Sequence, residues 1–160
     1  MKIIFNTKNL IDKIKNIAPT AEAKQTLMIL GNVIIKVENN KAYFTASDLE
    51  IQVSSSIDCD PDDNCEFSLP ARKLLEILSA LSNYESVTFS VSDSKVDITA
   101  GKSKISLPNL PTTDFPYMDP DQLGNETDIA SDDMINIIHK NSFAMAYKDA
   151  RHFLNGLHLC

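Results

Sequence analysis

Three aspartates, Asp58, Asp60 and Asp62, are spaced like the first three ligands of a calcium-binding loop. Such a loop also needs a glycine at its sixth position for the sharp turn, and a glutamate at its twelfth as a bidentate ligand. This chain has Asp63 and Leu69 at those positions. The spacing therefore favours a solvated acidic turn over residues 58–64 rather than a calcium site.

The sequence lacks motifs that would indicate an enzyme. His139, His152 and His158 are too scattered for a metal site, and His139 falls on the polar side of an expected helix. No nucleophile elbow, zinc-protease, phosphate-loop or dinucleotide motif occurs, and four glycines leave little backbone to surround a phosphate. We therefore expect no catalytic residues, no cofactor and no metal.

Basic side chains gather on or beside two expected helices. They are Lys8, Lys13, Lys15, Lys24, Arg72 and Lys73. Residues 1–25 hold five lysines and two acidic residues, although the whole chain has a net charge of −7. Lysine is also an ordinary helix former on a solvated face. If both helices line the same side of the protein, their charges form a stripe suited to weak, sequence-independent contact with phosphates.

A strand-then-helix pattern occurs three times and would position these residues. The strands end at Phe5, Leu69 and Ile129. The apolar residues that follow at helical spacing are Leu10, Ile11 and Ile14, then Leu74, Leu75 and Leu78, then Met134, Ile135 and Ile138. Copies about sixty residues apart indicate repeated small α+β modules rather than a common solenoid.

The first two copies each continue into three further strands. Residues 1–58 and 65–108 therefore both predict the order β-α-β-β-β. The expected strands are 2–6, 32–38, 41–47, 49–57, 65–69, 86–92, 95–100 and 103–107, and the expected helices are 7–17 and 70–81. We expect an α+β domain with both helices on one side and antiparallel sheets outside.

Four prolines between residues 107 and 124 predict a connector between two domains, 1–120 and 121–160. The second domain is expected to begin with a strand over 126–130 and a helix over 131–140. Because so short a piece cannot bury its apolar face, we expect the chain to be the first part of a longer protein.

The three cysteines are an odd number at unhelpful spacings. We expect free thiols in a reducing cytoplasm, and a Cys59–Cys65 bridge is the alternative. The first residues lack the apolar run of a secretory signal, and no segment is apolar enough to span a membrane. These features predict a cytoplasmic protein.

Six stretches, in order along the chain, resemble the bacterial sliding clamp family, the beta subunit of DNA polymerase III. They are Thr26–Asn32, Ser47–Glu50, Pro70–Lys73, Leu110–Pro111, Asp114–Pro116 and Phe143–Gly156. The resemblance implies the DNA-clamp fold of three similar domains, of which this chain matches less than half. It also implies a non-catalytic, head-to-tail homodimeric ring, which a clamp loader places around duplex DNA to tether the polymerase.

The resemblance also implies roles for individual residues. Those at DNA-contacting positions are Lys24, Arg72, Lys148, His152 and Phe153. Lys148 stands where the family often has glutamine, and His152 and Phe153 replace two tyrosines. Those at the subunit interface are Lys73, Ile77, Leu81, Lys95, Lys102, Lys104, Ile105 and Leu107. Arg151 and Leu154 match the rim and wall of a cleft that receives short clamp-binding peptides from polymerases and repair factors.

The alternative is a protein-interaction scaffold that uses the same repeated modules without binding DNA. The remainder of the gene would distinguish a clamp from such a scaffold. A clamp requires further pairs of β-α-β-β-β units and an apolar peptide cleft.

Overall fold

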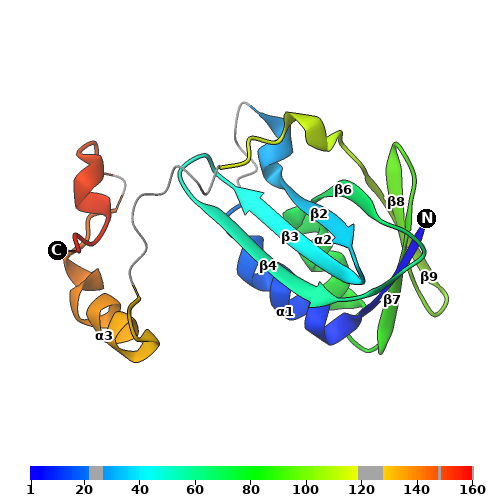
Figure 1. Cartoon of the computed structure of the whole chain (residues 1–160), viewed down its shortest axis with the longest axis horizontal. Coiled ribbons are helices and arrows are strands. Elements are labelled where there is room, and N and C mark those ends of the chain that lie inside the picture. The colour runs from blue at the N-terminus through cyan, green and yellow to red at the C-terminus, as the bar shows by residue number, and fades with distance from the viewer. Residues whose placement is uncertain (22–26, 119–127, 148, 160) are drawn as a thin grey trace. The chain divides into compact units, whose positions relative to one another are not determined.

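The computed structural model describes residues 1–21, 27–118, 128–147 and 149–159 (Figure 1). The chain divides into two compact units, Met1–Met118 (unit 1) and Asp119–Cys160 (unit 2). No helix in the described ranges is long and apolar enough to cross a membrane.

The described residues of unit 1 form nine strands and four helical segments. Their order is β1 (Lys2–Asn6), α1 (Thr7–Ile17), η1 (Met28–Gly31), β2 (Asn32–Glu38), β3 (Lys41–Ser47), β4 (Gln52–Asp58), β5 (Asp60–Pro61), β6 (Cys65–Pro70), α2 (Ala71–Ala80), β7 (Ser86–Val91), β8 (Lys95–Ala100), β9 (Ser103–Pro108) and η2 (Thr112–Asp114). Apart from the short η1, β5 and η2, this is the predicted β-α-β-β-β order, occurring twice.

The two halves of unit 1 exchange their first strands. One antiparallel sheet has the order β4-β3-β2-β6, and the other has the order β5-β1-β7-β8-β9. Strand β1 therefore pairs with β7 of the second half, with Phe5 opposite Val87, and β6 pairs with β2 of the first half, with Leu69 opposite Val33. The sequence pattern predicted the elements but not this exchange, which makes each half dependent on the other.

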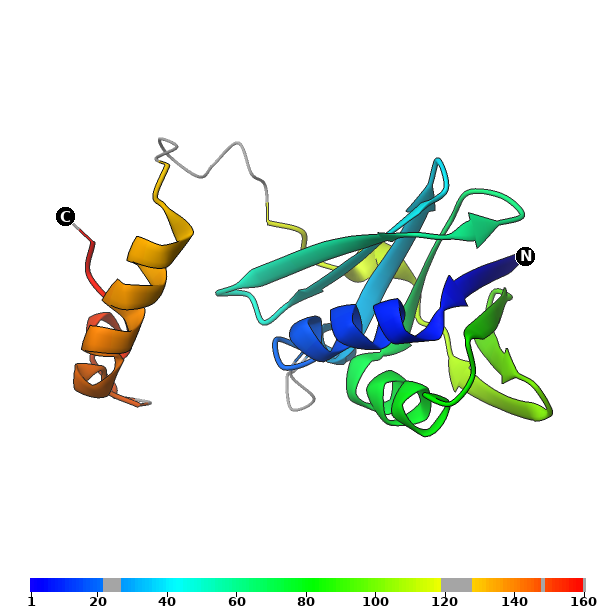
Figure 2. The ribbon, with the colours of Figure 1, turned by 90° about the horizontal axis from the view of Figure 1, so that it is seen from below.

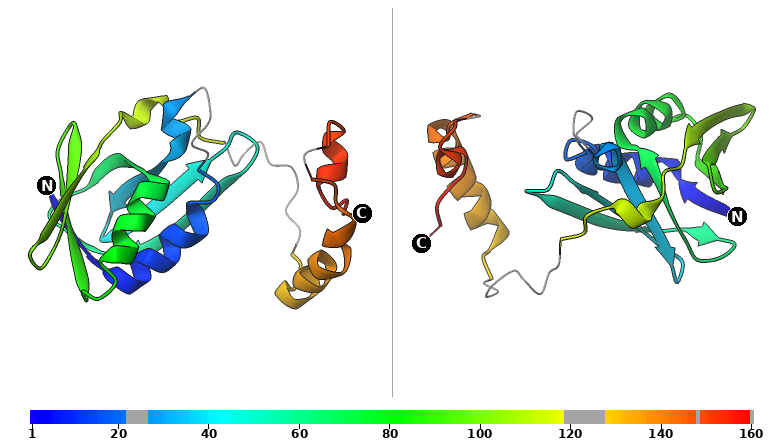
Figure 3. Two further views of the ribbon diagram at one scale, coloured as in Figure 1. Left: turned by 180° about the vertical axis from the view of Figure 1, so that it is seen from behind. Right: turned by 90° about the horizontal axis from the view of Figure 1, so that it is seen from above.

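Helices α1 and α2 lie side by side against one face of the four-stranded sheet (Figures 2 and 3). Of the apolar residues predicted to face inward, Leu10, Ile14, Leu74 and Leu78 are buried, and Ile11 and Leu75 are partly buried against the core. Helix α1 begins where the Asn6 side chain accepts a hydrogen bond from the Asn9 backbone N–H at 3.1 Å. Both helices are thus on one side of the sheets, as predicted.

Strand β4 begins three residues later than the expected strand over 49–57, because Ser47–Ile51 forms a tight turn. Leu49 has a φ of 78°. The Asp48 Oδ1 atom accepts hydrogen bonds from the backbone N–H groups of Glu50 (2.9 Å) and Ile51 (2.7 Å). These bonds offset the strain of a left-handed leucine.

The predicted solvated turn over 58–64 is wrong in part, because it contains strand β5, which pairs with β1. Asp62 accepts a hydrogen bond from Lys2 N at 3.0 Å and donates its own N–H to the Lys2 carbonyl oxygen at 3.0 Å. In the described parts of the chain, no group of three or more acidic, histidine or cysteine residues could hold a metal ion.

The connector after β9 is docked on unit 1 as far as Met118. Asn109 donates to the Ser92 carbonyl oxygen and accepts from Ser68 N at 3.0 Å. Phe115 joins Ile29, Leu30 and Ile34 in a small apolar cluster on the sheet face opposite the helices. Residues 109–118 are therefore a packed strap, which the proline-rich sequence did not indicate.

Cys59 and Cys65 are free thiols, as predicted, and both pack against the core. The pKa of the Cys65 thiol is raised to about 11, mainly because the thiol is partly buried. Cys160 lies outside the described residues.

Unit 2 contains α3 (Ser131–Asn141), η4 (Ser142–Ala144) and η5 (His152–Asn155). The strand expected over 126–130 is absent at residues 128–130, and positions 126–127 are not described. Ile135 and Ile138, on the apolar face of α3, are 51% and 44% exposed. No strand in the described part of unit 2 gives α3 a sheet to pack against, so this face is uncovered, as expected for so short a piece.

Candidate nucleic-acid interface and peptide pocket

The basic residues of α1 and α2 lie on neighbouring helices. Lys8, Lys15 and Arg72 are exposed, and Lys13 is half-buried. Lys73 forms an ion pair with Glu76 at 3.0 Å on the exposed surface of α2. Since exposed ion pairs contribute about 0–1 kcal/mol, this pair leaves Lys73 available for other contacts.

The residues predicted to contact DNA are divided between the two units. Arg72 lies in the first turn of α2 in unit 1, whereas Phe153 lies in η5 of unit 2 and is 79% exposed. Lys24 and Lys148 fall outside the described residues, and so does the side chain of His152. Only Arg72 is therefore placed with the α1 lysines.

Strand β9 forms one edge of the five-stranded sheet. Of the basic residues predicted for a subunit interface, Lys104 lies on β9, Lys95 on the neighbouring β8 and Lys102 in the turn between them, whereas Lys73 lies on α2. Lys104 and Lys95 form ion pairs with Asp97, at 3.0 and 3.5 Å. The pKa of Asp97 is lowered to about 2, mainly because Ser106 donates a hydrogen bond to its carboxylate. The hydrogen bond from Lys104 is the second cause. Asp97, which sequence reasoning missed, therefore holds two of the predicted lysines in place.

The apolar residues predicted for the same interface are mainly core residues. Ile77, Leu81 and Leu107 are at most 7% exposed and belong to the core of unit 1, whereas Ile105 is only partly buried against it. Lys102 is exposed in the turn between β8 and β9. The surface of this edge is thus mixed, with Lys104 and Ser106 exposed and Ile105 partly accessible.

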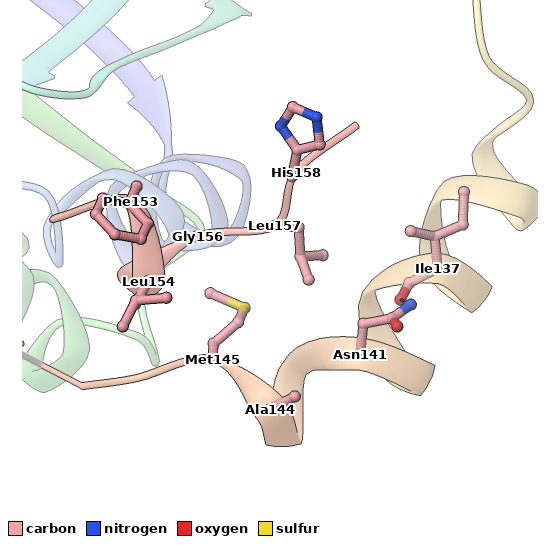
Figure 4. Close-up of a pocket in the computed structure, with 9 residues that line it drawn as sticks. All are labelled: Ile137, Asn141, Ala144, Met145, Phe153, Leu154, Gly156, Leu157 and His158. Carbon is pink, nitrogen blue, oxygen red and sulfur yellow. Dashed lines mark hydrogen bonds between the residues drawn. The ribbon is translucent and has the colours of Figure 1, made fainter. Parts of the chain in front are cut away.

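Unit 2 contains a pocket of about 460 Å³ (Figure 4). The residues that line it are Ile137, Asn141, Ala144, Met145, Phe153, Leu154, Gly156, Leu157 and His158. Leu154, predicted as a wall of the peptide cleft, is among them. Its carbonyl oxygen accepts a hydrogen bond from Ala146 N at 2.9 Å, which ties η5 to the segment after η4.

Arg151, predicted at the rim of that cleft, precedes η5 and is exposed. Its guanidinium donates to both carboxylate oxygens of Asp149, at 3.0 and 3.1 Å. This two-point contact lowers the pKa of Asp149 and fixes the guanidinium plane. Sequence reasoning did not single out Asp149, although it lies inside the matched stretch 143–156.

The family described as "DNA polymerase III beta subunit, N-terminal domain" matches residues 1–119. A relative from Vibrio cholerae named "Beta sliding clamp" is 30% identical over 158 residues, which are 98% of this chain and 43% of the relative. A Pseudomonas aeruginosa relative with the same name is 32% identical, with the same two coverages. The chain thus spans less than half the length of these curated relatives.

Solved structures give the same result. The structure "Caulobacter crescentus pol III beta" superposes with a TM-score of 0.90 at 29% identity, covering 98% of this chain and 42% of that one. The DNA polymerase III subunit beta from Pseudomonas aeruginosa superposes with a TM-score of 0.86 at 31% identity, covering 98% and 43%. The chain belongs to the DNA polymerase III beta subunit family, the bacterial sliding clamps.

Proposed function

We propose that this chain is the first domain and the start of the second domain of a sliding clamp, a non-catalytic processivity factor that encircles duplex DNA in the cytoplasm. The observation that carries the proposal is the placement of α1 and α2 side by side, with their lysines and Arg72 on an otherwise acidic protein. Such a surface attracts phosphates without reading bases.

Retention by a closed ring does not require tight binding. A few exposed lysines and arginines give weak, salt-sensitive contact, which lets the protein move along DNA. Residues 1–120 would then be the first clamp domain. Strand β9, with Lys95, Lys102 and Lys104, is the proposed contact with a second subunit of a homodimer.

The pocket lined by Leu154 is the proposed part of the peptide cleft that this chain contributes. Its partners would be subunits of DNA polymerase III, the clamp loader and other proteins that carry clamp-binding peptides. The apolar lining suits an apolar peptide side chain, and the Arg151–Asp149 pair supplies an oriented donor beside it.

The test uses the full-length protein loaded onto nicked circular DNA. We expect retention on the circle and loss after linearisation, because release then needs only sliding off an end. Lys24→Glu combined with Arg72→Glu should reduce loading or retention while the fold is unchanged. Lys36→Glu combined with Lys41→Glu, on the sheet, is the matched control. Equal retention on circular and linear DNA contradicts the proposal.

A further inference from the structure

The short helices η1 and η2 of unit 1 lie beside each other (Figures 1 and 3). Residues of these helices and of the segments just before them line a groove. It is lined by Leu27, Met28, Ile29, Leu110, Pro111 and Asp114, and its volume is about 210 Å³. Small-molecule pockets are usually about 300–1,000 Å³. The groove is therefore suited to one large side chain rather than to a whole small ligand.

The floor of the groove is fixed and one wall is free. Ile29 is buried, and Leu110 packs against the small cluster on the outer sheet face. The Leu110 backbone is held at both ends, since its N–H donates to Ser68 Oγ at 3.1 Å and its carbonyl oxygen accepts from that hydroxyl at 2.9 Å. Met28 is 78% exposed and Leu27 is 46% exposed. A rigid floor with an adaptable methionine wall favours an apolar side chain.

One wall of the groove corresponds in the repeat to one wall of the pocket of unit 2. The offset that separates Phe5 from Ile129 also separates Met28 from His152, the first residues of η1 and η5. In both units this short helix follows the first helix of a copy and lines an apolar hollow. The short helix thus lines an apolar hollow in both units, although the facing wall is α3 and η4 in unit 2 and the strap over residues 109–118 in unit 1.

The lining of the groove includes one acidic side chain, Asp114. Asp114 is exposed, and no lysine or arginine forms an ion pair with it in the described parts of the chain. The net charge of −7 also favours a basic partner.

We propose that this groove is a second peptide-docking site, which receives one large apolar side chain of a linear segment while an adjacent lysine or arginine meets Asp114. The choice of a peptide as partner rests on the proposed function of the unit 2 pocket. The apolar floor and Asp114 specify the chemistry of the segment independently of it.

The two hollows can be observed separately, because Met28 lines one and Met145 lines the other. The 160-residue chain is labelled with ¹³C at its methionine methyl groups and titrated with blocked pentapeptides, followed by NMR. The first probe has one phenylalanine between two pairs of lysines. The second has alanine in place of phenylalanine, and the third has glutamates in place of lysines. We expect a saturable shift of the Met28 methyl with the first probe and affinities weaker by about tenfold for the other two.

Two variants and a control test whether the first probe binds in the groove. Asp114→Asn should weaken the first probe several-fold, and Leu27→Gln should also weaken it. Ile51→Gln, an exposed apolar residue outside the groove, is the matched control and should leave the titration unchanged.

Three results overturn the proposal: no saturable shift at Met28, equal binding of the alanine probe, or a Met28 shift that follows protein concentration instead of peptide. The last result would assign the groove to a second copy of the chain. A Met28 response without a Met145 response counts against the peptide role of the unit 2 pocket and leaves this site supported.

Discussion

Ser68 joins the strap after β9 to the four-stranded sheet. Its hydroxyl is buried, accepts from Asn32 Nδ2 at 2.9 Å and from Leu110 N at 3.1 Å, and donates to the Leu110 carbonyl oxygen at 2.9 Å. A single hydroxyl thus satisfies three buried or partly buried polar groups. Such groups cost free energy when left unpaired, so the serine is important to the stability of unit 1.

Ser68→Ala should lower the free energy of unfolding of unit 1 by about 2–3 kcal/mol, because the Asn32 amide and the Leu110 N–H lose their partner. Urea unfolding followed by circular dichroism measures this change. Ser86→Ala, on the exposed end of β7, should change stability by less than about 0.5 kcal/mol. Equal effects of the two variants would show that the Ser68 network does not stabilise the strap.

Asp97 makes stability depend on pH in the acid range. The pKa of Asp97 is lowered to about 2 in the folded protein, below the roughly 3.9 of an unfolded aspartate. The stabilisation is therefore fully present above about pH 4 and is lost as pH falls through about 2.

Asp97→Asn should lower the urea midpoint at pH 7, and the difference from the unsubstituted protein should shrink steadily between about pH 4 and pH 2. The measurement is a series of urea titrations across this range. Asp12→Asn, on the exposed face of α1, is the control and should not reproduce the pattern. A difference that stays constant with pH would exclude Asp97 as the cause.

At the scale of elements, helical spacing predicted α1 and α2 to within a residue or two, because Leu10, Ile14, Leu74 and Leu78 mark a buried face. The same spacing predicted the position of α3, and its apolar face is exposed, as expected for a piece too short to cover it. The exchange of β1 and β6 between the two sheets could not be predicted from the sequence pattern. Strand order depends on contacts between segments far apart in the chain.

The candidate site was predictable only in part. The lysines of α1 and Arg72 were visible as charge on expected helices, and the matched stretch 143–156 pointed to Leu154. Asp97 and Asp114 were not visible, because their importance comes from neighbours that the fold brings to them: Lys104 and Ser106 for Asp97, and the floor of a groove for Asp114.

Helix α3 should be less protected from hydrogen exchange than α1. Four residues of α1 are buried, whereas none of α3 is, and an isolated helix of eleven residues is marginal in water. Hydrogen exchange followed by mass spectrometry should show α3 amides exchanging at least about a hundredfold faster than those of α1. Equal protection of the two helices would contradict the exposure of the α3 apolar face.

At the scale of the whole molecule, an acidic protein carries Lys8, Lys13, Lys15, Arg72 and Lys73 on one pair of neighbouring helices. In the proposed function, the net charge of −7 would repel DNA from most of the surface, while the basic residues of α1 and α2 would attract it locally. This division accounts for how a clamp can surround DNA without binding it tightly. The central claim is that the helices of unit 1, rather than its sheets, meet the duplex.

The most direct test is an NMR titration of the ¹⁵N-labelled chain with a short DNA duplex at low salt. We expect shifts at the amides of Lys8, Lys15 and Arg72 that weaken steeply as salt rises from about 20 to 200 mM, and little change on the outer faces of the sheets. Shifts centred on β2, β3 and β4, or no shift at the lowest salt, would contradict the account.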